Sequence, residues 1–483
     1  MAQIDSGPAG DRFVTRHGRS TRPVAGAIDL GSTVVKAGVL DAEGRLTEVR
    51  GIAAPPLSGD GDVREGDGAA YAAIADRLLG WLRDELPEAS PLGIASQRST
   101  FLLWDRRTLS PLVPMISWQD RRGAGWCARH AGLGQSVVRR TGLVLSAHYV
   151  GPKLATMLEA DTAWARRFRA PGSVFGTLDS YVMARWARKA VHDTDETMAA
   201  RTAMYDLELG DWSDTLLARY GVPREVLPRV CPTVGRRLPL RGGLVLEASL
   251  ADQASGAVTL FQRGATCAMV ILGTGAFVMR PAADATERIP GYLAAPVLSR
   301  PGSPTTFVQE GPVNGAGTAV DRFGKGPTPL PPEDPTPDAF CLPDAAGLGA
   351  PFWRPEIGFT LSTRAEGLPP PDLRRVAIEG VLFRVRQVLD DLALGGSHRV
   401  LLAGGLTRET AIPSGMAAVL KRPVHVLDSH EAVLIGASRL AAGLDPFASP
   451  PVTEVRPDRE GAYLPAKYGR WRSWVERLLV KAG

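Results

Sequence analysis

The sequence has few cysteines and no arrangement that would link them or use them to bind a metal. The four cysteines lie far apart, and no Cys-x-x-Cys pair or histidine cluster has the spacing of a zinc site: Cys127, Cys231, Cys267 and Cys341. This argues against a disulfide scaffold and against a zinc module. We expect reduced thiols in a cytoplasmic protein.

Long apolar runs and strong net charge are also missing. No apolar run reaches the roughly 18 residues that a membrane span needs, and the N-terminus lacks the apolar centre of a signal peptide. We therefore expect no membrane association. The net charge is only +5 over 483 residues. We expect a solvated surface and no nucleic-acid partner, because the basic excess is small.

The composition instead fits large globular cores. Hydrophobic residues make up 44% and charged residues 22% of 483 residues, which suggests two or three domains. Apolar residues recur at helical spacing from 69 to 86, and a buried strand is predicted over 92–95. The same alternation returns near the end of the chain, with expected elements at 374–394, 399–403, 409–420, 424–426 and from about 432. It predicts an α/β fold.

Two strand–turn–strand segments lie about half a chain apart. In the first, an apolar run ends at Asp29 and is followed by Gly31-Ser32-Thr33; in the second, Gly273-Thr274-Gly275 follows the run 265–272. Glycine amides and hydroxyls at such turns can face a phosphate. Asp29 could hold a hydrated Mg²⁺, which prefers one or two carboxylates. An ordinary hairpin capped by aspartate explains the first segment equally well.

A duplicated unit of this kind would place two phosphate-facing turns on either side of a cleft. That is the architecture of the actin, hexokinase and Hsp70 ATPases, so we expect by analogy two actin-like (ribonuclease H-like) α/β domains flanking a central cleft. The glycines Gly404 and Gly405, after the strand 399–403, would let a base or ribose lie against the backbone.

Two blocks, 93–105 and 114–122, carry many side-chain donors and acceptors. Arg98, Trp118 and Asp120 could bind a polyhydroxylated ligand through hydrogen bonds and an aromatic wall. An Arg–Asp ion pair beside a core tryptophan is the alternative. His148 alone is more typical of a packed or surface histidine.

One further carboxylate, Asp252, begins a run of small residues over 250–257. Small residues let a helix start approach a ligand closely, and Asp252 could accept a proton from a substrate hydroxyl. An N-cap aspartate explains the pattern equally well.

Together these blocks resemble the FGGY family of carbohydrate kinases from about Ala25 to Leu444. The motifs that carry the resemblance stand in the family's order: Ile28-Asp29-Leu30-Gly31-Ser32-Thr33, Gln97-Arg98, Trp104-Asp105, Ile116-Ser117-Trp118-Gln119-Asp120-Arg121-Arg122, Thr194-Asp195, Asp252-Gln253, Gly273-Thr274-Gly275, Gln309-Glu310-Gly311, Gly347-Leu348-Gly349-Ala350-Pro351-Phe352-Trp353 and Gly404-Gly405.

The resemblance implies a role for each matching residue. Asp252 corresponds to the catalytic base and Asp29 to the metal-associated aspartate, with ATP and Mg²⁺ as cofactors. The residues implied to contact the nucleotide are Ser32, Thr33, Lys36, Gly273, Thr274, Gly317, Gly404 and Gly405. Those implied to contact the substrate are Arg98, Ser99, Trp118, His148, Asp252 and Gln253.

Some residues depart from the patterns of particular members. Ser99 stands where glycerol kinase has a glutamate, and His148 replaces an aromatic residue, which argues against glycerol. Gln97-Arg98-Ser99 replaces the Gln-Met-His usual in xylulokinases, which argues against xylulose. Lys36 stands where glycerol kinase has an arginine, and this change removes no charge.

The expected division of the chain is a flexible N-terminal extension (1–23), a sugar-binding domain with the first phosphate loop (24–262), a nucleotide-binding domain (263–444) and a C-terminal extension (445–483). The expected function is ATP-dependent phosphorylation of a small sugar or polyol, and a homodimer is compatible with the sequence. Two alternatives are a nucleotide-driven chaperone and a catalytically silent sugar-binding or regulatory paralogue.

Overall fold

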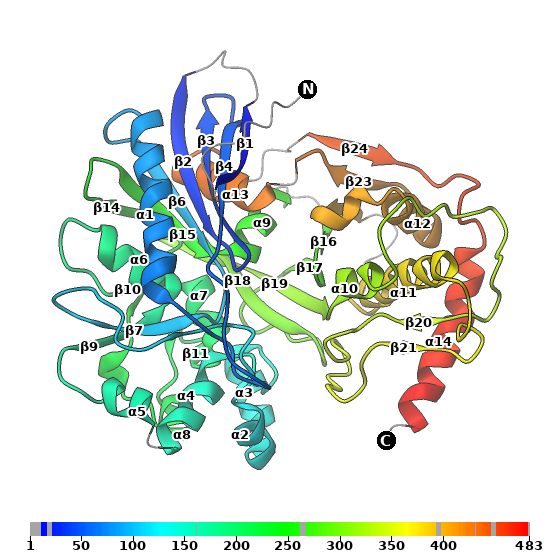
Figure 1. Cartoon of the computed structure of the whole chain (residues 1–483), viewed down its shortest axis with the longest axis horizontal. Helices are drawn as coiled ribbons and strands as arrows, with labels where there is room; N and C mark the ends of the chain where they lie inside the picture. The colour runs from blue at the N-terminus through cyan, green and yellow to red at the C-terminus, as the bar shows by residue number, and fades with distance from the viewer. Residues whose placement is uncertain are drawn as a thin grey trace.

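The computed structural model describes residues 11–16, 22–160, 162–260, 267–392, 398–429, 431–445 and 451–481. These residues form two α/β domains, each around a seven-stranded sheet (Figure 1). The first sheet has the order β1 (Asp11–Arg16), β4 (Leu46–Ala53), β3 (Val34–Asp41), β2 (Pro23–Leu30), β6 (Pro91–Ser96), β15 (Val245–Ala251) and β14 (Val234–Pro239). The second has the order β18 (Leu293–Arg300), β19 (Ser303–Val313), β17 (Ala276–Ala282), β16 (Cys267–Leu272), β22 (Arg399–Ala403), β23 (Val424–Leu427) and β24 (Val452–Val455).

The two sheets repeat one topology. In each, three antiparallel strands are followed by two parallel ones, β4-β3-β2-β6-β15 in the first and β19-β17-β16-β22-β23 in the second. Both glycine-containing turns occupy the same place in the repeat: one joins β2 to β3, and the other joins β16 to β17. The duplicated actin-like architecture expected from the sequence is confirmed.

The first hairpin is mostly apolar because both faces of its sheet are covered, with Asp29 and Lys36 near its turn as exceptions. Ile28 and Leu30 join the cluster that packs against α1 (Gly68–Glu85), whereas Ala27 joins the cluster that contains Leu434 of α13 (Ala432–Ala441). Strands covered on both faces lose the apolar–polar alternation of a half-exposed strand.

Helix α1 matches the range predicted from its periodicity. It begins after Asp67, whose Oδ1 accepts hydrogen bonds from the backbone N–H groups of Ala69 at 2.9 Å and Ala70 at 3.0 Å. Asp67→Ala is expected to lower the stability of the first domain by about 1 kcal/mol, because two helix-end donors lose their acceptor. Urea unfolding followed by circular dichroism measures this; an unchanged midpoint would contradict it.

Two helices cross at the centre of the molecule. They are α9 (Asp252–Leu260) and α13, and α13 lies against the first domain although it comes from near the end of the chain (Figure 1, orange). The contact is so close that a Cβ added at Gly436 would lie 2.0 Å from the Ser255 carbonyl oxygen. A Cβ at Gly93 would lie 2.3 Å from the Ala437 carbonyl oxygen. Glycine is required where these backbones meet.

Between β6 and β15 the first domain carries a large insertion. It holds the strands β7 (Phe101–Asp105), β8 (Met115–Ile116), β9 (Ser173–Thr177) and β10 (Asp193–Asp195), and the helices α2 (Ala124–Arg129), α3 (Gly134–Thr141), α4 (Val150–Glu159), α5 (Ala163–Phe168), α6 (Leu178–Trp186), α7 (Glu196–Ala199) and α8 (Asp214–Tyr220). The ribbon β18–β19 reaches from the second domain onto this insertion, where the Ala294 N–H donates to the Gly142 carbonyl at 2.9 Å.

Helices of the second domain cover its sheet: α10 (Ala316–Asp321), α11 (Pro370–Asp391) and α12 (Ala411–Leu420). The predicted ranges 374–394 and 409–420 correspond to α11 and α12, although residues 393–394 lie outside the described residues, and the element predicted from about 432 is α13. The expected boundary at 262/263 also lies outside them.

Both terminal segments differ from the expected extensions. Residues Asp11–Arg16 form β1, which pairs with β4. In the segment expected as a C-terminal extension, β24 pairs with β23, and α14 (Leu464–Lys481) packs into the second domain's core. Lys467 is fully buried and ion-paired with Glu379 at 2.8 Å, so a basic tail is part of the fold here rather than a solvated appendage. In the described part of the chain, no helix has the length and hydropathy to cross a bilayer.

Candidate active site

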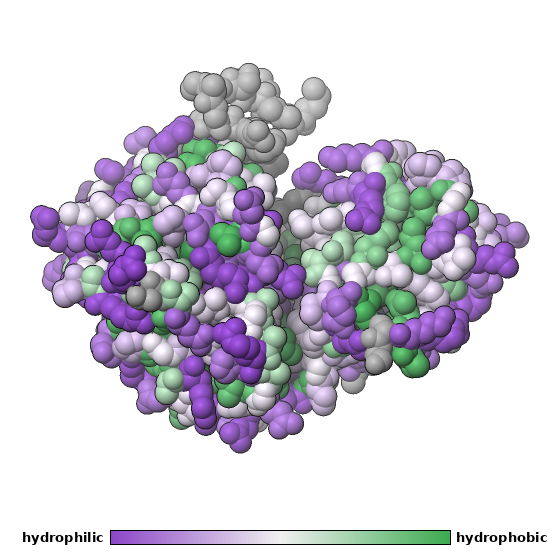
Figure 2. Space-filling model, turned by 60° about the horizontal axis from the view of Figure 1, so that its bottom comes forward, coloured by the Kyte–Doolittle hydropathy of each residue, from purple (hydrophilic) through white to green (hydrophobic). Residues whose placement is uncertain are grey.

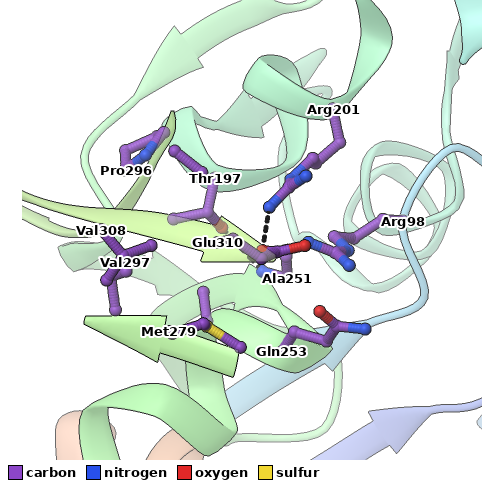
Figure 3. Close-up of a pocket in the computed structure, with 12 residues that line it drawn as sticks. Arg98, Thr197, Arg201, Ala251, Gln253, Met279, Pro296, Val297, Val308 and Glu310 are labelled. Atoms are coloured by element: carbon purple, nitrogen blue, oxygen red, sulfur yellow. Dashed lines mark hydrogen bonds and ion pairs between the residues drawn. The ribbon is translucent and has the colours of Figure 1, made fainter. Parts of the chain in front are cut away.

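The candidate site lies where the two domains face each other, and Figure 2 shows a hollow between them. Asp252, the first residue of α9, follows directly after β15 at this place. A small cavity of about 10 Å³, enough for about one water molecule, lies beside it among residues of both domains, including Arg98, Arg201, Gln253 and Glu310 (Figure 3).

Asp252 has the properties of a proton acceptor. Its side chain keeps 30% of its surface exposed, and its Oδ1 accepts a hydrogen bond from the Gln253 N–H at 2.7 Å. Burial of the carboxylate raises the pKa of Asp252. The positive charge of Arg98, whose Nε lies 4.0 Å from Oδ1, acts to lower it. A carboxylate of raised basicity that is open to a cleft suits general-base chemistry.

Three charged residues link the domains beside Asp252. Glu310 of β19 is almost completely buried and contacts Arg201 and Arg98 of the first domain, with Arg98 Nη1 3.4 Å from Glu310 Oε2 (Figure 3). Burial alone would raise the pKa of Glu310, but the two guanidinium groups lower it below its ordinary value. The carboxylate is therefore charged and shared between two arginines.

Arg201 and Glu310 were not among the residues singled out as candidate site residues. Arg201 follows a segment whose aspartates and threonines are typical of a capped helix, and Glu310 lies in β19, a strand of the other domain. Nothing local shows that residues 109 positions apart meet across the domain interface.

Trp118, expected as an aromatic wall, has 38% of its surface exposed. Three contacts hold its backbone: its N–H donates to Thr100 Oγ1 at 3.1 Å, the Lys153 Nζ donates to its carbonyl at 3.2 Å, and the His148 ring is hydrogen-bonded to it. Burial lowers the pKa of Lys153 to about 7 and that of His148 to about 4. His148 is thus neutral, and its ring is engaged with the Trp118 backbone.

Ser99 is also engaged with the protein. Its hydroxyl donates to the Arg201 carbonyl at 2.7 Å, and only 6% of the residue is exposed. Gln253 differs, because among the described residues no group bonds its buried Oε1 atom. Among the residues predicted to bind substrate, Ser99 and His148 use their polar atoms for contacts within the protein. Side-chain atoms of the other four are more available to a ligand: Arg98, Trp118, Asp252 and Gln253.

The first of the two turns expected to face phosphate, Gly31-Ser32-Thr33, follows β2 and is named the first phosphate turn. A Cβ at Gly31 would lie 2.5 Å from the Val34 carbonyl oxygen, so the turn requires glycine. The turn leaves Thr33 exposed and Ser32 partly exposed. Lys36 Nζ, on β3, contacts both carboxylate oxygens of Glu431 at 2.8 Å, just before α13. The lysine expected at the phosphate loop is thus paired with the residue that precedes α13.

Asp29 has the environment of a cation ligand. Its Oδ1 is buried and is bonded by no group in the described ranges. Burial and the nearby charge of Asp252 raise the pKa of Asp29 to about 8, despite the opposing charge of Lys36. A carboxylate that is buried without a donor and lies near a second one fits a divalent cation. Within the described residues no group of three or more acidic, histidine or cysteine side chains could hold a metal ion. Mg²⁺ ordinarily takes one or two carboxylates together with phosphate oxygens and water.

The second phosphate turn brings the other predicted glycines together. The Gly317 N–H, in α10, donates to the Thr274 carbonyl at 2.9 Å, and a Cβ at Gly317 would lie 2.3 Å from the Gly273 carbonyl oxygen. Gly404 has a φ of +100°, and a Cβ there would lie 2.3 Å from the Leu272 carbonyl oxygen. Gly405 follows at once. Glycine is therefore required where these backbones approach one another beside the turn.

Two glycine turns at equivalent places in a duplicated α/β fold, together with a partly exposed carboxylate of raised pKa, are typical of the actin-like ATPase class. Residues 24–236 match the N-terminal domain, and residues 329–443 the C-terminal domain, of the FGGY family of carbohydrate kinases. The chain belongs to this family, and it is an ATP-dependent carbohydrate or polyol kinase. This excludes the chaperone alternative.

Individual relatives agree with this assignment. The chain is 33% identical over 425 residues to a glycerol kinase of Bordetella parapertussis, covering 80% of this chain and 83% of that protein. Two solved structures share the fold. A Plasmodium falciparum glycerol kinase with ADP has a TM-score of 0.77 at 18% identity, covering 95% and 98% of the two chains. A ligand-bound xylulose kinase from Lactobacillus acidophilus has a TM-score of 0.79 at 18% identity, with the same coverage.

Proposed function

We propose that the chain transfers the γ-phosphoryl group of ATP to a hydroxyl of a small sugar or polyol, with Asp252 as catalytic base. The observation that carries this proposal is the position of Asp252: partly exposed, raised in pKa and next to the Arg98 guanidinium at the domain interface. A hydroxyl held by Arg98 would lie within reach of its carboxylate, which removes the proton as the oxygen attacks phosphorus.

The other groups bind and orient the two substrates. Trp118 and Gln253 would hold the sugar, while Ser32, Thr33, Gly273 and Thr274 would donate to the phosphates. Asp29 would hold Mg²⁺, which supplies charge neutralisation on the transferred group. Closure of the domains about α9 and α13 would exclude water and so limit ATP hydrolysis.

A coupled ADP-release assay with Mg²⁺-ATP against ketoses, aldoses, sugar acids and polyols tests the proposal. Curated relatives of the chain include a glycerol kinase, whereas Ser99 argues against glycerol, so glycerol belongs in the panel. One strong substrate would support the proposal. Silence across the panel with intact ATP binding would favour a sugar-binding or regulatory paralogue.

Trp118→Ala should raise KM for the sugar about tenfold, since the ligand loses an apolar face, while KM for ATP stays unchanged. Initial rates with each substrate varied in turn measure both constants. The control is Trp186→Phe, in which a buried tryptophan of α6 that donates to Asp76 is changed away from the cleft. An unchanged KM for the sugar would remove Trp118 from the binding site.

A further inference from the structure

A chain of buried hydrogen bonds connects the backbone of Trp118 with the first phosphate turn. The Trp118 N–H donates to Thr100 Oγ1 at 3.1 Å, and that hydroxyl donates to Gln97 Oε1 at 3.0 Å. The Gln97 Nε2 donates to the Tyr71 hydroxyl at 3.3 Å, which donates to the Gly31 carbonyl at 2.8 Å. Every donor points the same way, from the aromatic wall toward the turn.

The three connecting side chains are isolated from water. Thr100, Gln97 and Tyr71 are 0%, 5% and 2% exposed. Burial raises the pKa of Tyr71 well above its ordinary value, so its hydroxyl keeps the proton that it donates to Gly31. Hydrogen bonds in a buried chain polarise one another, and the loss of one leaves its partner unsatisfied. The chain is thus a stiff connection rather than a set of separate contacts.

The elements that it joins also contact one another elsewhere: α1 packs on the first hairpin, and the Gln97 N–H donates to the Leu30 carbonyl at 3.2 Å. Tyr71 comes from α1, Gln97 and Thr100 from the segment between β6 and β7, and Trp118 from the loop after β8. The Gly31 carbonyl belongs to the turn whose amides and hydroxyls face the nucleotide in the proposed function. One end of the hydrogen-bond chain therefore holds the backbone of Trp118, the proposed wall of the sugar site, and the other end holds the first phosphate turn.

We propose that Tyr71, Gln97 and Thr100 are positioning residues that hold the sugar wall and the first phosphate turn at the separation required for in-line transfer. This inference rests on the proposed function. Reacting groups displaced by about 1 Å can lose about 100-fold in rate, because the attacking oxygen no longer aligns with phosphorus. None of the three residues needs to touch either substrate.

Tyr71→Phe is the sharpest variant, because it keeps the ring in the core and removes only the hydroxyl. We expect kcat to fall about tenfold or more, while KM for each substrate stays within about threefold. The control is Tyr181→Phe, which removes another largely buried hydroxyl of the same domain, bonded to the Leu109 carbonyl at 3.0 Å. Equal kcat losses in both variants, or none in Tyr71→Phe, would overturn the proposal.

Thr100→Val tests the other end of the chain. It replaces a buried hydroxyl by a methyl group of similar size and leaves the Trp118 N–H without its acceptor. If the three residues act as one connection, the double variant Tyr71→Phe/Thr100→Val should lose about as much kcat as the more damaged single variant. Losses that multiply would indicate two independent structural effects and would contradict the connection.

Hydrogen–deuterium exchange tests the connection without turnover. A non-hydrolysable ATP analogue with Mg²⁺ should slow exchange in the peptide spanning 115–120 of the wild type, and Tyr71→Phe should abolish this protection. No protection in the wild type, or the same protection in Tyr71→Phe, would overturn the inference. If protection behaves as expected but no sugar is phosphorylated, the proposed function fails while the connection stands.

Discussion

Asp252→Asn is expected to lower kcat by about 100- to 10,000-fold, with nucleotide affinity within about twofold of the wild type. The amide keeps the size of the carboxylate and can still accept from the Gln253 N–H, at 2.7 Å in the structure. It has no basicity with which to accept the hydroxyl proton. ADP release in the coupled assay gives kcat, and calorimetric titration with ADP gives the affinity.

Asp67→Asn is the matched control for this change. Asp67 also begins a helix of the first domain and accepts backbone N–H bonds, and asparagine caps helices about as well as aspartate. The control should keep wild-type turnover. Near-normal turnover in Asp252→Asn would remove Asp252 from the mechanism, and the base would have to be sought elsewhere in the cleft.

Arg201→Met is expected to cost about 3–5 kcal/mol of stability at pH 7, because it leaves the carboxylate of Glu310 buried without its closest cation. Glu310 is 2% exposed, and its remaining partner, Arg98, lies 3.4 Å away. The midpoint of urea unfolding measures the loss. We also expect a lower kcat/KM for the sugar, since Arg98 would be drawn toward Glu310 and away from Asp252.

The pH dependence of this loss has a defined sign. The pKa of Glu310 is lowered in the folded protein, so its ion pairs stabilise the fold above the ordinary glutamate pKa of about 4.3 and stop doing so as pH falls through the lowered value. The wild type should therefore lose its advantage over Arg201→Met at acid pH. Arg201→Met/Glu310→Leu, which removes both charges, should recover most of the stability at pH 7. A deficit independent of pH would contradict this account.

The parts of the site that lie within one local pattern could be predicted from the sequence. Both glycine turns, the helix over 69–86 and the placement of Asp252 follow from residues that are neighbours in the chain. The partner of Arg201 could not be predicted, because Glu310 lies on a strand of the other domain. Nor could the pairing of Lys36 with Glu431, since the two residues are 395 positions apart and the sequence places Lys36 only at the first glycine turn.

Two buried polar residues illustrate one physical limit on such predictions. The basic segment after residue 444 is expected from the sequence to be a C-terminal extension, yet Lys467 is fully buried because Glu379 and Asp334 neutralise it. The His148 ring is hydrogen-bonded to the Trp118 backbone, and its contact with the substrate stays a prediction. In both cases a polar residue is stable inside the protein only through partners that are distant in sequence or belong to the backbone.

The position of α13 bears on how the chain acquires its fold during synthesis. Residues 432–441 cover one face of a sheet that begins at residue 11, so that face stays open to solvent until most of the chain has left the ribosome. The first domain cannot complete its core ahead of the second, as domains made in succession ordinarily do. A fragment ending at residue 262 would expose the apolar residues around Ala27, and the two halves are expected to reach their native state together.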